Sequence, residues 1–525
     1  MKLLFLPVAF LATIVSADVA MAKDPVAPFE NSPNPDTPYA QIDSFVFGKL
    51  SQLGIQPANI CSDSVFVRRV FLDVIGTLPT AAEVAGFISD IQPNKRALLI
   101  DSLLNRPEFA DYWGMKWADL LRIKAEFPVN LWPDAAQGYD HWIRDSIRQN
   151  IPYSQFARDL LTANGSNFCA PQVNFYRAAG SKDPKAIAHA VAQTFMGERT
   201  AAWPKDKLDA MAAFFSQIGF KPTGEWKEEI VYYNGFDDSK AVVGKATLPD
   251  GAPVTLTPGK DPRVIFTDWL ILSKNSPFTT NAVNRIWYWL MGRGIIQEPD
   301  DIRPDNPPSD PQLLAWLARE LVSSNYDVKH ICRLILNSRA YQLSCIPATR
   351  DPKAAACFAY HPLRRMEAEV LIDALDQITG STEEYSSMVP EPFTWMPPDE
   401  RAMCIPDGSI TSSFLDLFGR PPRDTGLLSE RSEHPTSGQR LHLLNSSHIQ
   451  LKLTKSDKLK FLFQSNPLPR DAIRQLYLTI LSRYPTDDEL VALRAYNQTA
   501  EAKGWQVWYD LAWALFNTSE FSYRH

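Results

Sequence analysis

Several motifs that would identify an activity are absent from this chain of 525 residues. It has no His-Glu-x-x-His, no Gly-x-x-x-x-Gly-Lys-Ser/Thr, no Gly-x-Ser-x-Gly and no complete Gly-x-Gly-x-x-Gly. The chain therefore lacks the usual signatures of zinc peptidases, P-loop enzymes, α/β-hydrolases and dinucleotide-binding proteins. There is also no Cys-x-x-Cys, so we expect no zinc ribbon, no thioredoxin-type site and no covalent haem.

The chain also lacks an excess of positive charge. Its 53 lysines and arginines are outnumbered by 60 acidic residues, which gives a net charge of -7. Because nothing is in surplus to neutralise phosphates, we expect no nucleic-acid partner. Glycine is scarce, at 23 residues, whereas proline reaches 41. This balance favours many helix starts and rigid loops over a glycine-rich β-sandwich.

Long hydrophobic segments are missing except at the start of the chain. Lys2 precedes an apolar stretch from Leu3 to Val15, and Ala20-Met21-Ala22 has the small-x-small pattern of a cleavage site. We therefore predict a signal peptide over residues 1–22, which is too short to serve readily as a permanent anchor. The mature chain, without a transmembrane anchor, is then expected in the periplasm or outside the cell.

Six cysteines lie in the expected mature chain. In an oxidising compartment they permit disulfides, but the spacing does not select among the 15 possible pairings. We expect buried thiols together with one or two bridges. The cysteines are Cys61, Cys169, Cys332, Cys345, Cys357 and Cys404.

Hydrophobic periodicity predicts a mainly α protein with two helical domains. A proline-rich arm at 23–38 precedes a first helical domain at 39–222, and a second covers 261–525. Between them, residues 223–260 contain short β-type stretches and a Pro-Asp-Gly turn at 249–251, which predict a small β-hairpin insertion.

The helical domains are predicted to contain helical-hairpin repeats. Residues 67–83 align without a gap on 473–489, and a third partial copy starts at Pro308-Ser309. Each copy shows a capping-box pattern, namely Thr80 with Glu83, Thr486 with Glu489 and Ser309 with Gln312. We interpret the repetition as structural rather than as a repeated ligand site.

A set of short segments, spread over nearly the whole mature chain, resembles one bacterial family. The segments include Arg68-Arg69-Val70-Phe71-Leu72-Asp73, Leu103-Leu104-Asn105-Arg106-Pro107, Asn284-Arg285-Ile286-Trp287, Gly292-Arg293-Gly294, Arg364-Arg365-Met366-Glu367, Phe418-Gly419-Arg420-Pro421 and Gln439-Arg440-Leu441-His442. They resemble the large secreted planctomycete-type proteins built from domains of unknown function 1549 and 1553. The resemblance places the first of these domains at 39–222 and the second at 261–525. It implies secretion and an association with c-type cytochromes, but no established activity.

One departure from the family pattern matters. Family members typically carry Cys-x-x-Cys-His before a helix that ends in Ala-Phe-Phe. Here the corresponding segment, 195–204, contains neither cysteine nor histidine and leads to Ala213-Phe214-Phe215. The resemblance therefore implies a non-haem member, and no cofactor is evident.

Two groups of polar residues are candidate ligand or catalytic residues. Arg365, Glu369 and Asp373 follow an i, i+4, i+8 spacing, which predicts either an ion-pair ladder on one helix face or the anchor of a polar ligand. Asp300 and Asp301 lie in a proline-rich loop, where they could bind a divalent cation or act as acid and base. The alternative is that one holds loop N–H groups and pairs with Arg293 or Arg303.

A third group lies further along the chain. It comprises Glu430, Arg431, Gln439, His442 and Asn445, the last three at an i, i+3, i+6 spacing. His442 is a candidate general base, and a satisfied polar core is the alternative.

A zinc site made with the neighbouring histidines is disfavoured, since His434, His442 and His448 are six to eight residues apart. Loop tryptophans could stack on sugar rings, while those at helical spacing should be core. The loop tryptophans are Trp132, Trp203, Trp226 and Trp395.

Three functions fit these observations. The first is a binding or assembly component of a cytochrome-associated or polysaccharide-processing system outside the cytoplasm, with a secreted protein, a cytochrome or a glycan as partner. The second is an enzyme acting on carbohydrate, with acids and His442 in the cleft between the domains. The third is a structural envelope protein. Oligomeric state is left open.

Overall fold

The computed structural model describes residues 29–30, 40–235, 244–257, 259–272, 277–466, 469–498 and 505–525. The predicted signal peptide, nearly all of the proline-rich arm and the β-type stretch at 241–243 lie outside these residues. Within them, no helix combines the length and the apolar character that crossing a membrane requires.

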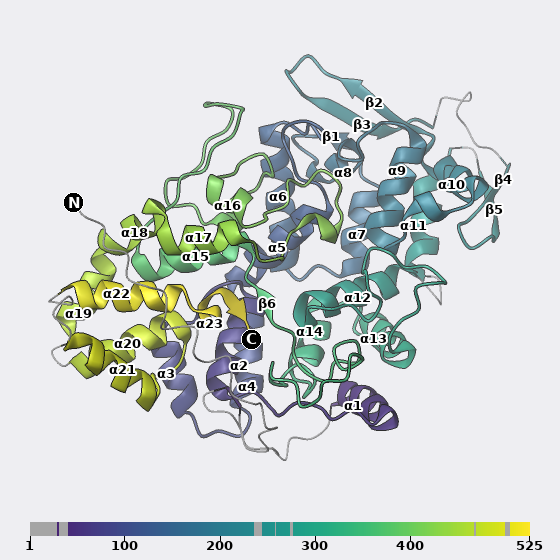
Figure 1. Cartoon of the computed structure of the whole chain (residues 1–525). Helices are drawn as coiled ribbons and strands as arrows, with labels where there is room; N and C mark the ends of the chain where they lie inside the picture. Colours follow the sequence, from purple (N-terminus) through teal and green to yellow (C-terminus); the bar gives the residue numbers. More distant parts are fainter. Residues whose placement is uncertain are drawn as a thin grey trace.

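The described chain is mainly helical, as predicted (Figure 1). The first half contains α1 (Gln41–Leu53), α2 (Asp63–Val74), α3 (Ala81–Ser89), α4 (Lys95–Leu104), α5 (Pro107–Leu120), α6 (Pro133–Arg148), α7 (Tyr153–Leu161), α8 (Asn174–Arg177), α9 (Pro184–Val191), the π-helical turn η2 (Ala192–Met196) and α10 (Lys205–Ala212). The second half contains α11 (Pro262–Leu272), α12 (Pro277–Met291), α13 (Pro311–Ser323), α14 (Val328–Leu336), α15 (Ala368–Thr379), the 3-10 turn η5 (Ala402–Cys404), α16 (Ser413–Leu417), α17 (Ser437–Asn445), α18 (Ser447–Thr454), α19 (Asp457–Ser465), α20 (Pro469–Leu481), α21 (Asp487–Asn497), α22 (Trp505–Phe516) and α23 (Ser519–Ser522).

Two of the three predicted capping boxes are confirmed. Thr80 and Thr486 each accept the backbone N–H three residues on, while Glu83 and Glu489 accept the N–H of their cap residue. The third is wrong: the N-cap of α13 is not Ser309 but the next residue, Asp310, whose carboxylate accepts the N–H groups of Gln312 and Leu313. An ionised carboxylate at the cap also suits the positive end of the helix dipole. The duplication itself stays a prediction.

The strands form three small antiparallel sheets. Strands β2 (Ile218–Pro222) and β3 (Glu229–Tyr233) form a hairpin, and β1 (Gly165–Ser166) from the first helical half pairs with the other edge of β3. The predicted hairpin around 249–251 is confirmed as β4 (Gly244–Thr247) and β5 (Pro253–Leu256). A third pair was not predicted: β6 (Arg364–Arg365) pairs with β7 (Tyr523–Arg524), close to the C-terminus.

The two halves share one continuous apolar core. Figure 1 shows the purple helices α2 and α3 beside the yellow elements α20, α23 and β7, so early and late segments of the described chain pack together. Residues far apart in sequence are thereby buried as one body, which is why the two domains predicted from sequence do not have separate cores.

Helix α2 joins these parts through two buried arginines. Arg68 donates to the backbone carbonyls of Ile480 and Phe521, at 2.9 and 2.8 Å. Arg69 donates to the carbonyls of Tyr341 and of the last residue, His525. Both side chains are about 1 % exposed. The Arg-Arg pair of the family-like segment is therefore buried, and it connects distant segments through hydrogen bonds to their backbone carbonyls.

One turn further along α2, Asp73 is the centre of a buried ionic network. Its Oδ1 lies 3.1 Å from both Arg364 and Arg524, and its Oδ2 accepts the Tyr341 hydroxyl at 2.9 Å. Glu367 continues the network by pairing with Arg524 and, at 3.0 Å, with Lys116 of α5. These charges avoid the full cost of burial only because each has partners from other segments.

The cysteines behave differently from what we expected. All six are free thiols in the structure, so the expected bridges are not formed. Burial raises the pKa of Cys332 and, to about 12, that of Cys404, which keeps both thiols protonated and unreactive.

We predict that Asp73→Asn lowers the free energy of unfolding by about 3–5 kcal/mol, because two buried arginines lose their shared counter-charge. Urea denaturation followed by circular dichroism measures this. The matched control is Asp101→Asn, which removes an exposed pair with Arg333 and should cost less than about 1 kcal/mol. Equal effects of the two substitutions would contradict the central role of Asp73.

Candidate functional site

A cleft of about 330 Å³ lies between the two halves of the described structure. The first half contributes the loop before α3, Glu83 of α3 and the start of α5. The second half contributes the end of α15 and the following loop. The lining residues are Thr77, Leu78, Thr80, Glu83, Arg106, Glu108, Asp373, Asp376, Gln377, Ser381, Thr382, Asp399, Glu400 and Arg401.

Acidic groups dominate this cleft. Six of the lining residues are Asp or Glu and two are Arg. Arg106 is already paired, at 2.9 Å with Glu83 and at 2.6 Å with Glu108. Gln377 joins the two walls by donating to the carbonyl of Leu78 at 2.9 Å. The cleft thus combines a fixed shape with a surplus of negative charge.

Asp373 is the most unusual group in the cleft. It is 8 % exposed and accepts the backbone N–H groups of Ala402 and Met403, at 2.6 and 3.2 Å. Burial raises the pKa of its carboxyl group to about 7, against the lowering effect of Arg401 and of these two N–H groups. A carboxyl group with a pKa near neutrality can both give and take a proton.

A chain of charged and polar groups leads away from the cleft. Asp376 pairs with Lys452 of α18 at 2.5 Å, and Lys452 pairs with Glu383 at 3.1 Å. Glu383 lies 2.9 Å from His448 Nε2, and His448 Nδ1 lies 3.2 Å from His442 Nε2. The Glu383 carboxylate accepts a hydrogen bond from the Nε2–H group of His448, so in neutral His448 the Nδ1 atom accepts and His442 Nε2 donates.

His442 therefore lies at the far end of this chain and does not line the cleft. Burial and the neighbouring His448 lower the pKa of His442. Its ring packs edge-on against Phe414 and Phe418. The prediction that His442 shares the inter-domain cleft with the acids is wrong, because α17 places it on the other side of the Asp376–Lys452 pair.

The predicted ladder of Arg365, Glu369 and Asp373 is also wrong. Arg365 belongs to strand β6, before α15 begins, and donates instead to the carbonyls of Phe418 and Ser432. The prediction from helical spacing was wrong because the chain is extended at Arg365 and does not become helical until Ala368.

Glu369 and Arg431 form a second buried ionic cluster and do not line the cleft. Arg431 lies 2.6 Å from Glu369 and 2.7 Å from Asp119 of α5. Burial opposes ionisation of Glu369, but Arg431 and Arg420 outweigh it and lower its pKa to about 2. Both side chains are fully paired, so for Arg431 the alternative of a satisfied polar core holds.

Asp300 and Asp301 are separated by their contacts. Asp300 is 2 % exposed, pairs with Arg285 of α12 at 2.8 Å and accepts the N–H of Leu428 at 2.6 Å. Asp301 pairs with Arg303 at 3.2 Å. The structural alternative holds only in part: the two roles fall on different acids, and the partner of Asp300 is Arg285, which sequence reasoning did not identify.

The remaining candidates have local roles. Glu430 accepts the backbone N–H groups of Asp424 and Thr425. Gln439 completes a capping box with Thr436 and donates to the carbonyl of Leu417 at 3.0 Å. Asn445 is exposed at the end of α17. Within the described ranges, no three His, Cys, Asp or Glu side chains are grouped as metal ligands.

Sequence reasoning missed most of the cleft. Arg106, Glu108, Asp376, Glu400 and Arg401 were not singled out, although Arg106 lies inside one of the family-like segments. The hydrogen bond from Arg106 lowers the pKa of Glu108, whereas burial raises the pKa of Glu400. The only sequence signal was the density of acids around 373–400, which solvent-exposed loops also show.

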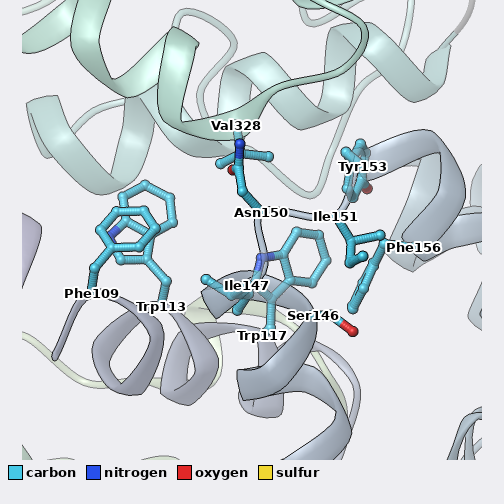
Figure 2. A pocket seen from close by; sticks show the side chains of 10 residues that line it. All are labelled: Phe109, Trp113, Trp117, Ser146, Ile147, Asn150, Ile151, Tyr153, Phe156 and Val328. Atoms are coloured by element: carbon cyan, nitrogen blue, oxygen red, sulfur yellow. The ribbon is translucent and has the colours of Figure 1, made fainter. Parts of the chain in front are cut away.

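A second hollow, shown in Figure 2, is much smaller, at about 30 Å³. It lies among α5, α6, α7 and α14. Trp113 and Trp117 line it with other apolar side chains, and Trp117 packs against Phe156 at 5.4 Å. A space of this size holds about one water molecule, so we assign it to core packing.

The segment that corresponds to the haem motif of the family does not fit a covalently attached haem. Trp203 Nε1 donates to Glu198 at 2.8 Å, and Lys207 lies 3.8 Å from the centre of the Trp203 ring. His189 of α9 reaches this segment, and its Nδ1 lies 2.7 Å from the Thr200 hydroxyl. With no cysteine to form thioether bonds, this segment offers no covalent attachment.

Comparison with known proteins identifies two helical domains of unknown function. A family model named PSCyt2, a protein of unknown function (DUF1549), matches residues 41–218, and one named PSD1, a protein of unknown function (DUF1553), matches residues 262–497. The chain therefore belongs to the planctomycete-type, cytochrome-associated family that carries these domains. No curated protein and no solved structure matches it.

We predict that Asp373 makes stability depend on pH. Its pKa is 3.8 in the unfolded reference and about 7 when folded, so between these values the folded state binds more protons. Its contribution to stability is complete below the lower value and is lost as the pH rises through the upper one. Wild-type stability should therefore fall more steeply than that of Asp373→Asn, by up to about 1.4 kcal/mol per pH unit.

Urea unfolding at a series of pH values between these limits measures the difference in slope. Thr382→Ala, an uncharged change in the same cleft, is the control and should reproduce the wild-type slope. If wild type and Asp373→Asn have parallel pH profiles, Asp373 is not the proton-binding group that we describe.

Proposed function

We propose that this protein is a secreted, non-haem binding component of a polysaccharide-processing system outside the cytoplasm. In this proposal the acidic cleft receives the hydroxyl groups of a carbohydrate chain. The observation that carries it is the cleft itself, which has a volume of about 330 Å³ and lies where the two family domains meet. This volume is at the lower end of the range for small-molecule sites.

The charges of the cleft support a hydroxyl-rich ligand. Ionised carboxylates are pure acceptors, and each can accept hydrogen bonds from two neighbouring hydroxyl groups. The surplus of acids disfavours a phosphate, a sulfate or a nucleotide by like-charge repulsion. Since both arginines in the lining are close to carboxylates of the protein, at 2.6–3.8 Å, they are poorly placed to hold an anion.

We predict that neutral oligosaccharides bind and that sulfated ones do not. Glu400→Gln and Asp399→Asn should each weaken binding about tenfold or more, since each removes a charged hydrogen-bond acceptor. Isothermal titration calorimetry measures the affinities. Asp457→Asn is the control, because Asp457 is an exposed residue of α19, outside the cleft. Equal affinities across these variants would overturn the assignment of the cleft.

Asp373 favours a second candidate, a carbohydrate-hydrolysing enzyme. Its pKa is near 7, whereas the pKa of Glu108, another residue of the same cleft, is lowered by the hydrogen bond from Arg106. Two carboxyl groups with opposite shifts are the pattern of a proton donor and an ionised partner. In this version Asp373 protonates the oxygen of the leaving sugar, and water completes the hydrolysis.

If the enzyme version holds, Asp373→Asn should reduce turnover by a factor of about 10²–10⁴ and leave binding largely intact. Release of reducing ends from neutral polysaccharides measures turnover, and calorimetry on the same variant measures binding. Absence of turnover in the wild type supports the binding version, in which a secreted hydrolase or a cytochrome partner performs the chemistry. Absence of both activities supports the structural alternative.

A further inference from the structure

Three aromatic rings gather at the surface, away from the residues that line the cleft. Trp132, Trp226 and Phe393 form a triangle with ring centres 4.7, 5.5 and 5.4 Å apart. We call this group the aromatic platform. Its members come from the start of α6, the turn between β2 and β3, and the loop between α15 and η5. Residues from three distant parts of the chain thus meet in one cluster.

The platform is not part of the apolar core. Trp226 is 62 % exposed and Phe393 40 % exposed. The same loops carry other exposed apolar side chains, which are Phe127, Met388 and Trp395. Exposed rings gathered in one place usually mark a binding surface, whereas single exposed apolar residues need no explanation.

A hollow of about 200 Å³ lies beside the platform and contains polar groups. Trp132, Glu126, Asn130 and Lys227 line it, together with Ala125, Phe127 and Val389. The Lys227 ammonium lies 5.1 Å from the centre of the Trp132 ring and 5.8 Å from that of Trp226. Glu126 accepts the hydroxyl of Ser387 at 2.9 Å, which ties the Phe393 loop to the hollow.

The backbone of this hollow is strained. Asn130, Trp132 and Lys227 have φ angles of 62°, 74° and 64°, in the left-handed region that side chains other than glycine seldom adopt. Backbone hydrogen bonds hold the conformation: Asn130 N donates to Glu126 O at 2.8 Å, and Trp132 N donates to Ala125 O at 3.2 Å. Strain of this kind concentrates at ligand-binding sites, where it presents side chains in fixed positions.

We propose that the aromatic platform and its hollow form a binding site for the sugar rings of a neutral polysaccharide. The exposed ring surface of Trp226 and Phe393 suits the apolar faces of sugar rings. Glu126, Asn130 and Lys227 supply an acceptor, an amide and a donor for the hydroxyl groups at the ring edge. One acid beside one base gives the site no net charge, which matches an uncharged ligand.

This site is independent of the acidic cleft, with which it shares no lining residue. The segment 381–401 borders both: Ser381 and Arg401 line the cleft, and Val389 lines the hollow. A single loop therefore connects two surfaces suited to hydroxyl-rich ligands. The platform assignment can hold even if the cleft proves to bind nothing.

The test is affinity electrophoresis of the purified protein in gels containing neutral glucan, xylan or mannan. At least one polysaccharide should retard the wild type, and Trp226→Ala and Phe393→Ala should each weaken that binding about tenfold or more. Trp226→Phe keeps a flat ring and should restore most of it. Phe461→Ala, which removes a 70 % exposed ring of α19, is the control and should bind like the wild type.

Cleft variants separate this proposal from the proposed function. Retardation that survives Glu400→Gln but not Trp226→Ala supports the platform, whatever the cleft does. Retardation that Trp226→Ala and Phe393→Ala leave unchanged overturns it. The platform assignment is also overturned if none of the three polysaccharides retards the wild type. Because both rings are exposed, melting temperatures should match the wild type and exclude misfolding as the cause.

Discussion

The structure depends on the pairing of one buried carboxylate, Asp73, with arginines from the far end of the chain. Helix α2 carries Arg68, Arg69 and Asp73 within two turns, and all three point into the protein instead of into solvent. An unpaired charge in this position would cost several kcal/mol, so the chain is stable only when strands β6 and β7 bring Arg364 and Arg524 to it. This requirement explains why the first and second halves share a core: each half contains charges that only the other can neutralise.

The cleft results from the same contact between the two halves of the chain. Where the charges are matched, as in the pairs of Arg431 with Asp119 and Glu369, the halves close tightly around them. Where acids outnumber bases, between α3, α5 and α15, a hollow remains and Asp373 lies in its wall with a pKa near 7. Paired charges thus hold the two halves together, and unmatched charges line the candidate site. The aromatic platform adds a second surface, held by a loop that also borders the cleft.

The sequence predicted the candidate residues by type better than by location. Arg365 and Glu369 were expected to share one helix face, as an ion pair or as the anchor of a polar ligand, but each bonds to a different segment. Periodicity describes neighbours on one helix, and it fails where a helix begins a few residues later than the pattern suggests. That Asp376 and Glu108 line the same cleft could not have been predicted, because they are more than two hundred residues apart in the sequence. Trp132 and Trp226 were recognised as loop residues, while their assembly into one platform was not.

The sequence by itself determined the helical class, two of the three capping boxes, the β-hairpin at 249–251 and the membership of a family whose two domains cover most of the chain. These features follow from interactions between residues close in sequence, or from segments long enough to be matched directly. Only the tertiary structure decided which charges are neutralised and which remain in a cleft, which aromatic side chains reach the surface together, and that His442 lies outside the site. Those outcomes depend on burial and on partners brought from distant segments, because burial sets the cost of a charge and distant segments supply what compensates it.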